Sequence, residues 1–170
     1  MRAIAVNDNW AYPPVPGDDR QCYGNATFAA RRCTRNRIAV GVRGEIDAVN
    51  GRDLGRYVAH HTRASRQLVL DLRAVDFFGT QGFTALYYIS VHCTRTDVDW
   101  AIVASRPVRR LLAICDPEGE LPLADNLRSA LSRLDRIAHS RHHTSWAAQS
   151  GWAVPSPASR AGHRGHGRAS

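Results

Sequence analysis

Short apolar stretches recur along the middle of the chain and alternate with longer stretches that are apolar on only one side. Brief apolar runs bounded by polar residues are typical of β-strands. Such runs predict strands at residues 27–33, 37–42, 67–72, 100–104 and 121–123. The first two, separated by three polar residues, form a hairpin. The run at 67–72 suits a central strand with both faces covered.

Helical periodicity fills the intervals between the predicted strands. Asp47 is suited to be the N-cap of the first helix, because its carboxylate can accept the free N–H groups of the first turn. The expected inward faces are Leu54, Val58 and His61 in the first helix; Phe83, Leu86, Tyr87, Ser90 and Cys93 in the second; Val108, Leu111, Leu112 and Cys115 in the third; and Leu127, Leu131, Leu134 and Ala138 in the fourth. Pro107 fits the first turn of the third helix.

The order of elements predicts an α/β fold, with a mixed sheet of four to five strands and about four helices. Residues 27–138 form this domain. Residues 1–26, interrupted by prolines and glycines, are expected to be an irregular segment. Residues 139–170 lose the periodicity and are expected to be a disordered tail rich in His, Arg and Ser. Flexible tails are therefore predicted at both ends.

The formal net charge of +8 is unevenly distributed. Residues 139–170 hold four arginines and no acid, so half of the excess lies in the tail. A basic tail attracts polyanions weakly and in a salt-dependent way, without reading sequence. Specific nucleic-acid binding is not expected, although an accessory role of the tail remains an alternative. His163 and His166 have no neighbouring cysteine or carboxylate, so no metal site is expected there.

Other sequence features limit the possible functions. The four cysteines lack CxxC spacing and suggest no disulfide framework. No window approaches the roughly 20 apolar residues of a membrane span, and the N-terminus lacks the apolar stretch of a signal peptide. A cytoplasmic protein without membrane contact is expected. Motifs of hydrolases, metalloproteases and nucleotide-binding loops are not found, so neither an enzyme nor a cofactor is expected.

Two local patterns resemble the STAS family. Residues 42–47 (VRGEID) are similar to the G-x-[IL]-D turn before the family's first helix. Residues 68–83 (LVLDLRAVDFFGTQGF) resemble its L-D-L-x-x-V-x-F-[IM]-D-S-[SA]-G-[LI] strand and loop. The resemblance covers about 110 residues and implies an anti-sigma factor antagonist. Such a protein binds an anti-sigma factor that is a serine-protein kinase, which releases a sigma factor, and a phosphatase reverses the phosphorylation.

Carried over by position, the family's phosphorylated serine falls on Thr80. Gly79 and Gln81 depart from the family pattern, whereas Thr80 keeps a hydroxyl group. Two interpretations of Thr80 stay open, a phosphorylation site and a helix cap. The resemblance implies a partner-binding surface of Gly44, Glu45, Ile46, Asp47, Phe78, Gly79, Thr80, Gln81, Gly82 and Phe83. One of Phe77 and Phe78 is expected in the core and the other partly exposed. The alternative function is a STAS scaffold or sensory module, binding a ligand or self-associating, without a phosphorylation switch.

Overall fold

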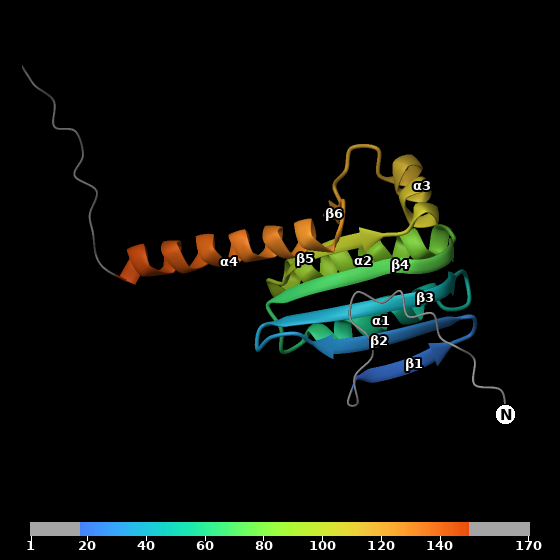
Figure 1. Ribbon diagram of the computed structural model, residues 1–170, viewed down its shortest axis with the longest axis horizontal. Helices are drawn as coiled ribbons and strands as arrows, with labels where there is room; N and C mark the ends of the chain where they lie inside the picture. The colour runs from blue at the N-terminus through green and yellow to red at the C-terminus, as the bar shows by residue number, and fades with distance from the viewer. Residues whose placement is uncertain (1–17, 150–170) are drawn as a thin grey trace, which may run out of the picture.

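The computed structural model describes residues 18–149, which form a six-stranded mixed sheet and four helices (Figure 1). The elements are β1 (Asp19–Tyr23), β2 (Ala26–Arg32), β3 (Arg37–Ile46), α1 (Gly51–Thr62), β4 (Gln67–Phe78), α2 (Thr80–Thr96), β5 (Asp99–Ala104), α3 (Arg106–Cys115), β6 (Leu123–Ala124) and α4 (Leu127–Gln149). The predicted α/β class, the opening hairpin and the central strand are confirmed.

The strands lie in the order of the chain, from β1 at one edge to β6 at the other. The pairs β1–β2 and β2–β3 are antiparallel, and β3, β4, β5 and β6 are parallel to one another. The expected four to five strands were too few, because β1 lies in the segment 1–26 that was predicted to be irregular. Its sequence, DRQCY, has no apolar alternation, since four of its five residues are exposed.

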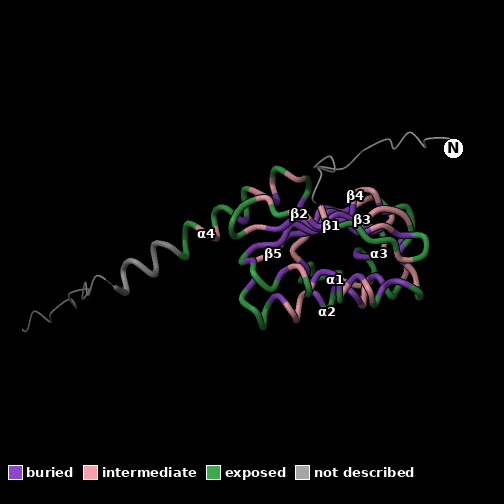
Figure 2. The backbone as a smooth tube through the Cα atoms, turned by 90° about the horizontal axis from the view of Figure 1, so that it is seen from below, coloured by how far each residue is buried: buried purple, intermediate pink, exposed green. Residues whose placement is uncertain are grey.

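Alternate side chains of the strands point to opposite faces of the sheet, and each face is covered by its own hydrophobic core. One core, under α1, α2 and α3, includes Phe28, Val40 and Leu70, which are fully buried. The smaller core lies on the other face, where α4 packs Leu134 against Val69. Figure 2 shows α1 and α2 together on one side of the sheet, with buried segments turned toward it. The strict alternation follows from the two-residue period of a strand.

The inward face of α2 differs in part from its prediction. Leu86 and Cys93 are buried as expected, but Tyr87 is 59% exposed. Ile89, three residues after Leu86, is buried in its place. The helix therefore presents a narrower apolar stripe to the sheet, and both Tyr87 and Tyr88 reach the surface.

Helix α4 is longer than the sequence predicted. The periodicity of apolar residues ends near Ala138, yet the helix continues to Gln149 and extends beyond the body of the domain (Figure 1). Arg141 explains part of this continuation, because its guanidinium lies 2.7 Å from Asp97 and 2.9 Å from Asp99. Helix α4 thus extends past residue 139, where the disordered tail was expected to start, and residues 150–170 lie outside the described part.

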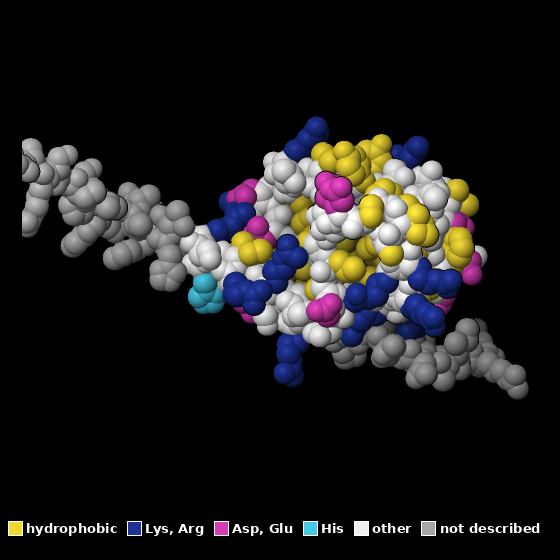
Figure 3. All heavy atoms as spheres, turned by 90° about the horizontal axis from the view of Figure 1, so that it is seen from above, with side chains coloured by type: hydrophobic (Ala, Val, Ile, Leu, Met, Phe, Trp, Pro, Cys, Tyr) yellow, Lys and Arg dark blue, Asp and Glu magenta, His cyan; other side chains and the backbone are white. Residues whose placement is uncertain are grey.

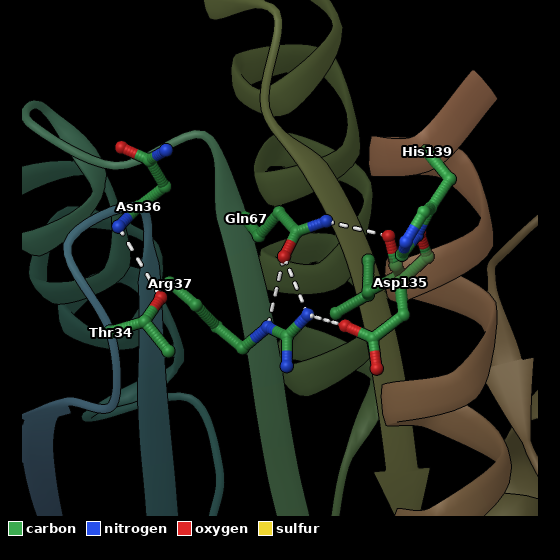
Figure 4. A network of polar contacts seen from close by, with 7 residues as sticks. Thr34, Asn36, Arg37, Gln67, Asp135 and His139 are labelled. Atoms are coloured by element: carbon green, nitrogen blue, oxygen red, sulfur yellow. Dashed lines mark hydrogen bonds and ion pairs between the residues drawn. The ribbon is translucent and has the colours of Figure 1, made fainter. Parts of the chain in front are cut away.

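A buried amide joins the two central parallel strands to α4 (Figure 4). Gln67, 6% exposed, donates from Nε2 to the carbonyl oxygen of Leu134 at 2.7 Å. Its Oε1 accepts from Arg37 Nε at 2.9 Å and Nη2 at 2.7 Å, and the same guanidinium contacts Asp135. Every polar atom of the amide that faces the interior thus has a partner, as burial of a polar group requires.

Replacing Gln67 with Ala is expected to lower the free energy of unfolding by about 1–3 kcal/mol, because it leaves the Leu134 carbonyl and the Arg37 guanidinium without this partner. Chemical denaturation measures the change. Gln81→Ala is the control: it truncates an exposed glutamine and should change stability by less than about 0.5 kcal/mol. Equal effects of the two variants would contradict the assigned role of Gln67.

Candidate functional site

The two motifs singled out in the sequence meet at one edge of the sheet. Strands β3 and β4 are parallel, and their last residues, Ile46 and Phe78, pair in register. The backbone N–H of Gly79 then donates to the carbonyl oxygen of Ile46 at 2.8 Å. The turn after β3 and the turn before α2 are therefore held side by side, although about 30 residues separate them in the chain.

The last part of β3, just before the turn, depends on a glycine. Gly44 has φ +91°, and a Cβ atom there would lie 2.1 Å from the carbonyl oxygen of Asn25. Only glycine fits this position without moving the neighbouring strand. Gly44 therefore has a structural role that needs no partner. The adjacent Glu45 is exposed, and one of its carboxylate oxygens accepts from Asn25 Nδ2 at 3.2 Å.

The N-cap of α1 is Asn50, not the predicted Asp47. Asp47 lies three residues earlier, and its carboxylate accepts from the backbone N–H of Val49 at 2.8 Å. Asn50 is 1% exposed and donates from Nδ2 to the carbonyl oxygens of Glu45 and Tyr23 at 2.9 and 3.1 Å. Asn50 therefore holds the end of β3 and the end of β1 with its side chain and makes no side-chain cap for α1, a role that the sequence pattern did not predict.

Thr80 is the first residue of α2, and its side chain is exposed. The N-cap is Gly79 without a side-chain cap, so the capping interpretation of Thr80 was wrong. Within residues 18–149 no hydrogen bond involves the Thr80 hydroxyl, and the backbone N–H groups of Thr80 and Gln81 have no acceptor. The first turn of a helix carries partial positive charge and free donors, which favour an anion.

The ten predicted partner-binding residues differ widely in exposure. Glu45, Thr80 and Gln81 are exposed; Gly44, Asp47, Gly79 and Phe83 are half-buried; Ile46, Phe78 and Gly82 are buried. As expected, one of the two phenylalanines lies in the core. It is Phe78, 5% exposed, so the surface residue is Phe77, 53% exposed, which was absent from the predicted surface.

Apolar side chains lie at the surface near both turns. Val49 is 76% exposed between β3 and α1, and Phe77 is the next-to-last residue of β4, with its ring beside Gly79. On the face shown in Figure 3, hydrophobic side chains also reach the surface in several groups, with arginines gathered along one side. Exposed phenylalanine next to a turn is suited to anchor an interface. Phe77 therefore joins Thr80 and Glu45 at the candidate site.

Metal-binding groups and cysteine thiols were the remaining chemistry to locate in the described residues. Between residues 18 and 149, no group of three or more His, Cys, Asp and Glu residues is arranged to hold a metal ion. Burial raises the pKa of the Cys93 thiol to about 12, so it stays protonated. The other cysteines are free as well. No described helix is long and apolar enough to cross a membrane.

Residues 30–130 match the family model described as STAS domain. The chain belongs to the STAS domain family. Osmosensory protein A of Mycobacterium tuberculosis is 32% identical over 125 residues, which cover 70% of this chain and 77% of that protein. The anti-sigma-F factor antagonist RsfA of the same species is 33% identical over 124 residues, which cover 71% of this chain and 97% of RsfA.

Solved structures share the fold. A crystal structure of an anti-sigma factor antagonist from Mycobacterium paratuberculosis matches with a TM-score of 0.53 and 25% identity, covering 64% of this chain and 92% of that one. The anti-sigma factor antagonist SpoIIAA in its unphosphorylated form matches with a TM-score of 0.53 and 14% identity, covering 64% and 96%. At that identity the second match concerns the fold alone.

Substitution by alanine is expected to change the stability of the protein in opposite directions at two glycines of α1. A Cβ atom at Gly51 would lie 2.9 Å from the carbonyl oxygen of Gln81, whereas one at Gly55 would meet nothing within 4 Å. Gly51→Ala is therefore expected to lower the free energy of unfolding by about 1–3 kcal/mol. Gly55→Ala should raise it by up to about 1 kcal/mol, since alanine is the better helix former. Thermal and chemical denaturation compare the two, and equal shifts would contradict the close packing of α1 against Gln81.

His92 is expected to make the stability of the folded protein sensitive to acid. Its Nε2 lies 2.9 Å from the Thr62 hydroxyl, and desolvation, followed by the charge of Arg63, lowers the pKa of His92. The unfolded chain then binds this proton more tightly, so stability starts to fall below about pH 6.5 and continues to fall until the folded-state pKa is passed. His92→Gln should reduce the loss of stability between about pH 7 and about pH 5. An unchanged loss in urea titrations at these pH values would exclude His92 as a cause.

Proposed function

We propose that this protein is an anti-sigma factor antagonist. It binds an anti-sigma factor of the serine-kinase type and thereby releases a sigma factor, and phosphorylation of Thr80 controls the binding. Membership of the STAS domain family supports the general role, as does the similarity to RsfA over 97% of that protein. The observation that carries the proposal is the exposed Thr80 hydroxyl at the start of α2, beside the end of β3, where Glu45 lies.

The position of Thr80 explains how a phosphate would break a complex without unfolding the domain. A phosphate adds roughly −1.5 to −2 charges at one point. At the first turn of α2 the free N–H groups of Thr80 and Gln81 favour that charge, so the fold tolerates it. In an interface the same charge would be desolvated, and it would be added to the exposed carboxylate of Glu45. Phosphorylation would therefore weaken binding of the partner without lowering the stability of the domain.

Two exposed apolar side chains would complete the docking surface. Val49 and Phe77 stand at the two turns, and Thr80 begins the helix beside them. A phenylalanine that is half exposed in the free protein can be buried on association, and aromatic anchors commonly carry much of the binding energy. Phe78, Ile46 and Gly82, being buried, would support the shape of this surface and not touch the partner.

A second candidate is a STAS scaffold or sensory module that is never phosphorylated. Gly79 and Gln81 favour it, because they depart from the aspartate and from the serine or alanine of the family's phosphorylated loop. In that case Thr80 would be only an exposed first residue of α2. Titration against anti-sigma factors separates the two functions, since only the first requires such a partner.

Calorimetric titration of the purified protein against the anti-sigma kinases of its own genome, first with ADP and then with ATP, tests the proposal. Tight binding in ADP is expected, with loss of binding in ATP and a phosphate on Thr80 by mass spectrometry. Thr80→Glu should weaken binding in ADP at least about tenfold, which is about 1.4 kcal/mol. Thr80→Ala should bind equally with either nucleotide.

Thr84→Ala is the matched control, because it removes a threonine hydroxyl one turn further along α2, where it donates to the carbonyl oxygen of Thr80 at 3.1 Å. This variant should still be released by ATP. Binding that persists in ATP without modification would contradict the phosphorylation switch but not the antagonist role. Absence of binding to every kinase would contradict the antagonist role itself and favour the second candidate.

A further inference from the structure

A groove of about 610 Å³ runs along the outer surface between α1 and α2. Gly55, Ala59 and Ala85 line it with small side chains. Arg52 and Arg56 stand on the α1 side, and Thr84 and Tyr88 on the α2 side. We call it the α1–α2 groove. Its volume lies within the range of about 300–1,000 Å³ typical of binding sites. The small residues at the bottom of the groove belong to the two helices and not to the turns of the candidate site.

Contacts between the two helices close the groove at both ends. At one end Gly51 packs directly against the backbone of Gln81, the residue next to Thr80. At the other end His92 Nε2 lies 2.9 Å from the Thr62 hydroxyl. That hydroxyl donates to the carbonyl oxygen of Val58 at 2.9 Å, which leaves it to accept from His92. Between these ends the space above Gly55 is open, because a Cβ atom there would meet nothing within 4 Å.

The charge of the α1–α2 groove has one sign. Two guanidinium groups line it, and none of its ten lining residues is acidic. The acid on α1 is Asp53, whose carboxylate lies 3.6 Å from the Arg56 guanidinium and does not line the groove. On the opposite side Tyr88 is 65% exposed, with its ring 6.5 Å from that of Tyr87. An occupant must therefore combine apolar side chains with negative charge.

We propose that the α1–α2 groove receives an acidic amphipathic helix of the anti-sigma factor, an inference that rests on the proposed function. Apolar side chains of that helix enter the space above Gly55, between Ala59 and Ala85. Its carboxylates pair with Arg52 and Arg56, and Tyr88 packs against its apolar face. Insertion of an amphipathic helix into a groove is a recurrent mode of recognition. The twelve residues of α1 span about 18 Å, enough to hold about three turns of such a helix.

The geometry joins this groove to the regulated turn. Gln81 lines one end of the groove and directly follows Thr80 in the chain. A partner that covers both the groove and the start of α2 would contact Thr80 at one end of the interface, so phosphorylation would affect that end. The helix in the groove would add buried surface that is far from the phosphate. The exposed Tyr87 and Tyr88 would then lie within the interface and not at free surface.

Filling the groove tests the proposal without harming the fold. Gly55→Leu places an apolar side chain in the open space, and Gly55→Ala is the matched control, which improves the helix but leaves most of the space free. Titration against the anti-sigma kinase that the wild type binds in ADP should show a loss of affinity of at least about tenfold for Gly55→Leu. For Gly55→Ala the change should stay below about threefold, and thermal denaturation should show that both variants remain folded.

Charge reversal tests the chemistry of the occupant. The double variant Arg52→Glu/Arg56→Glu should weaken binding of the same kinase at least about tenfold. Arg133→Glu, an exposed arginine on α4, should have little effect. Replacement of Tyr88 by p-benzoylphenylalanine, with irradiation of the complex, should attach an acidic segment of the kinase, which mass spectrometry of the cross-linked peptide identifies.

The outcomes separate this inference from the proposed function. If the wild type binds a kinase and Gly55→Leu binds it equally well, the groove is not the docking site and the antagonist role stands. A cross-link to a basic segment, or to a second copy of this chain, also overturns the inference. If the wild type binds no kinase in ADP, the proposed function and the helix in the groove fail together.

Discussion

The parallel pairing of β3 with β4 is the constraint on which the rest of the structure depends. Parallel strands end at the same edge of a sheet, so the register of Ile46 with Phe78 brings together two turns that are distant in the chain. The hydrogen bond from the Gly79 N–H to Ile46 then fixes where α2 begins. At the opposite ends of the same two strands, Gln67 and Arg37 attach α4. One strand pair thus positions both the candidate site and the long helix.

The apolar pattern predicted those elements whose stability comes from burial. β4 was predicted because six consecutive residues, Gln67 to Leu72, are buried, and five of them form one run in the sequence that is apolar except for Asp71. Helix α3 and the hairpin were also predicted from the apolar residues that they bury. β1 was not predictable in this way. It is held by backbone pairing to β2, and the polar contacts of its side chains carry no periodic signal. The continuation of α4 past Ala138 was missed for a related reason, because ion pairs with Asp97 and Asp99 hold the helix at Arg141.

The candidate site was predictable in location but not in detail. The spacing of the motifs located the two turns, yet nothing in the sequence distinguished the buried Phe78 from the exposed Phe77. That choice follows from an irregular register between β3 and β4, with shifts after Gly41 and Gly44, which changes the side that later residues face. The role of Asn50 likewise depends on carbonyl oxygens from two parts of the chain, those of Tyr23 and Glu45. The α1–α2 groove depends on how far apart two helices lie, a distance that no local pattern encodes.

The exposed character of β1 has a consequence of its own. Among residues 18–149 this strand forms one edge of the sheet, and an exposed edge is a template on which a strand of another molecule can pair and start aggregation. Asp19, Arg20 and Gln21 make the edge polar and charged. These polar side chains give β1 no apolar alternation in the sequence. In the folded protein they also disfavour pairing of β1 with another copy of the chain into an extended sheet.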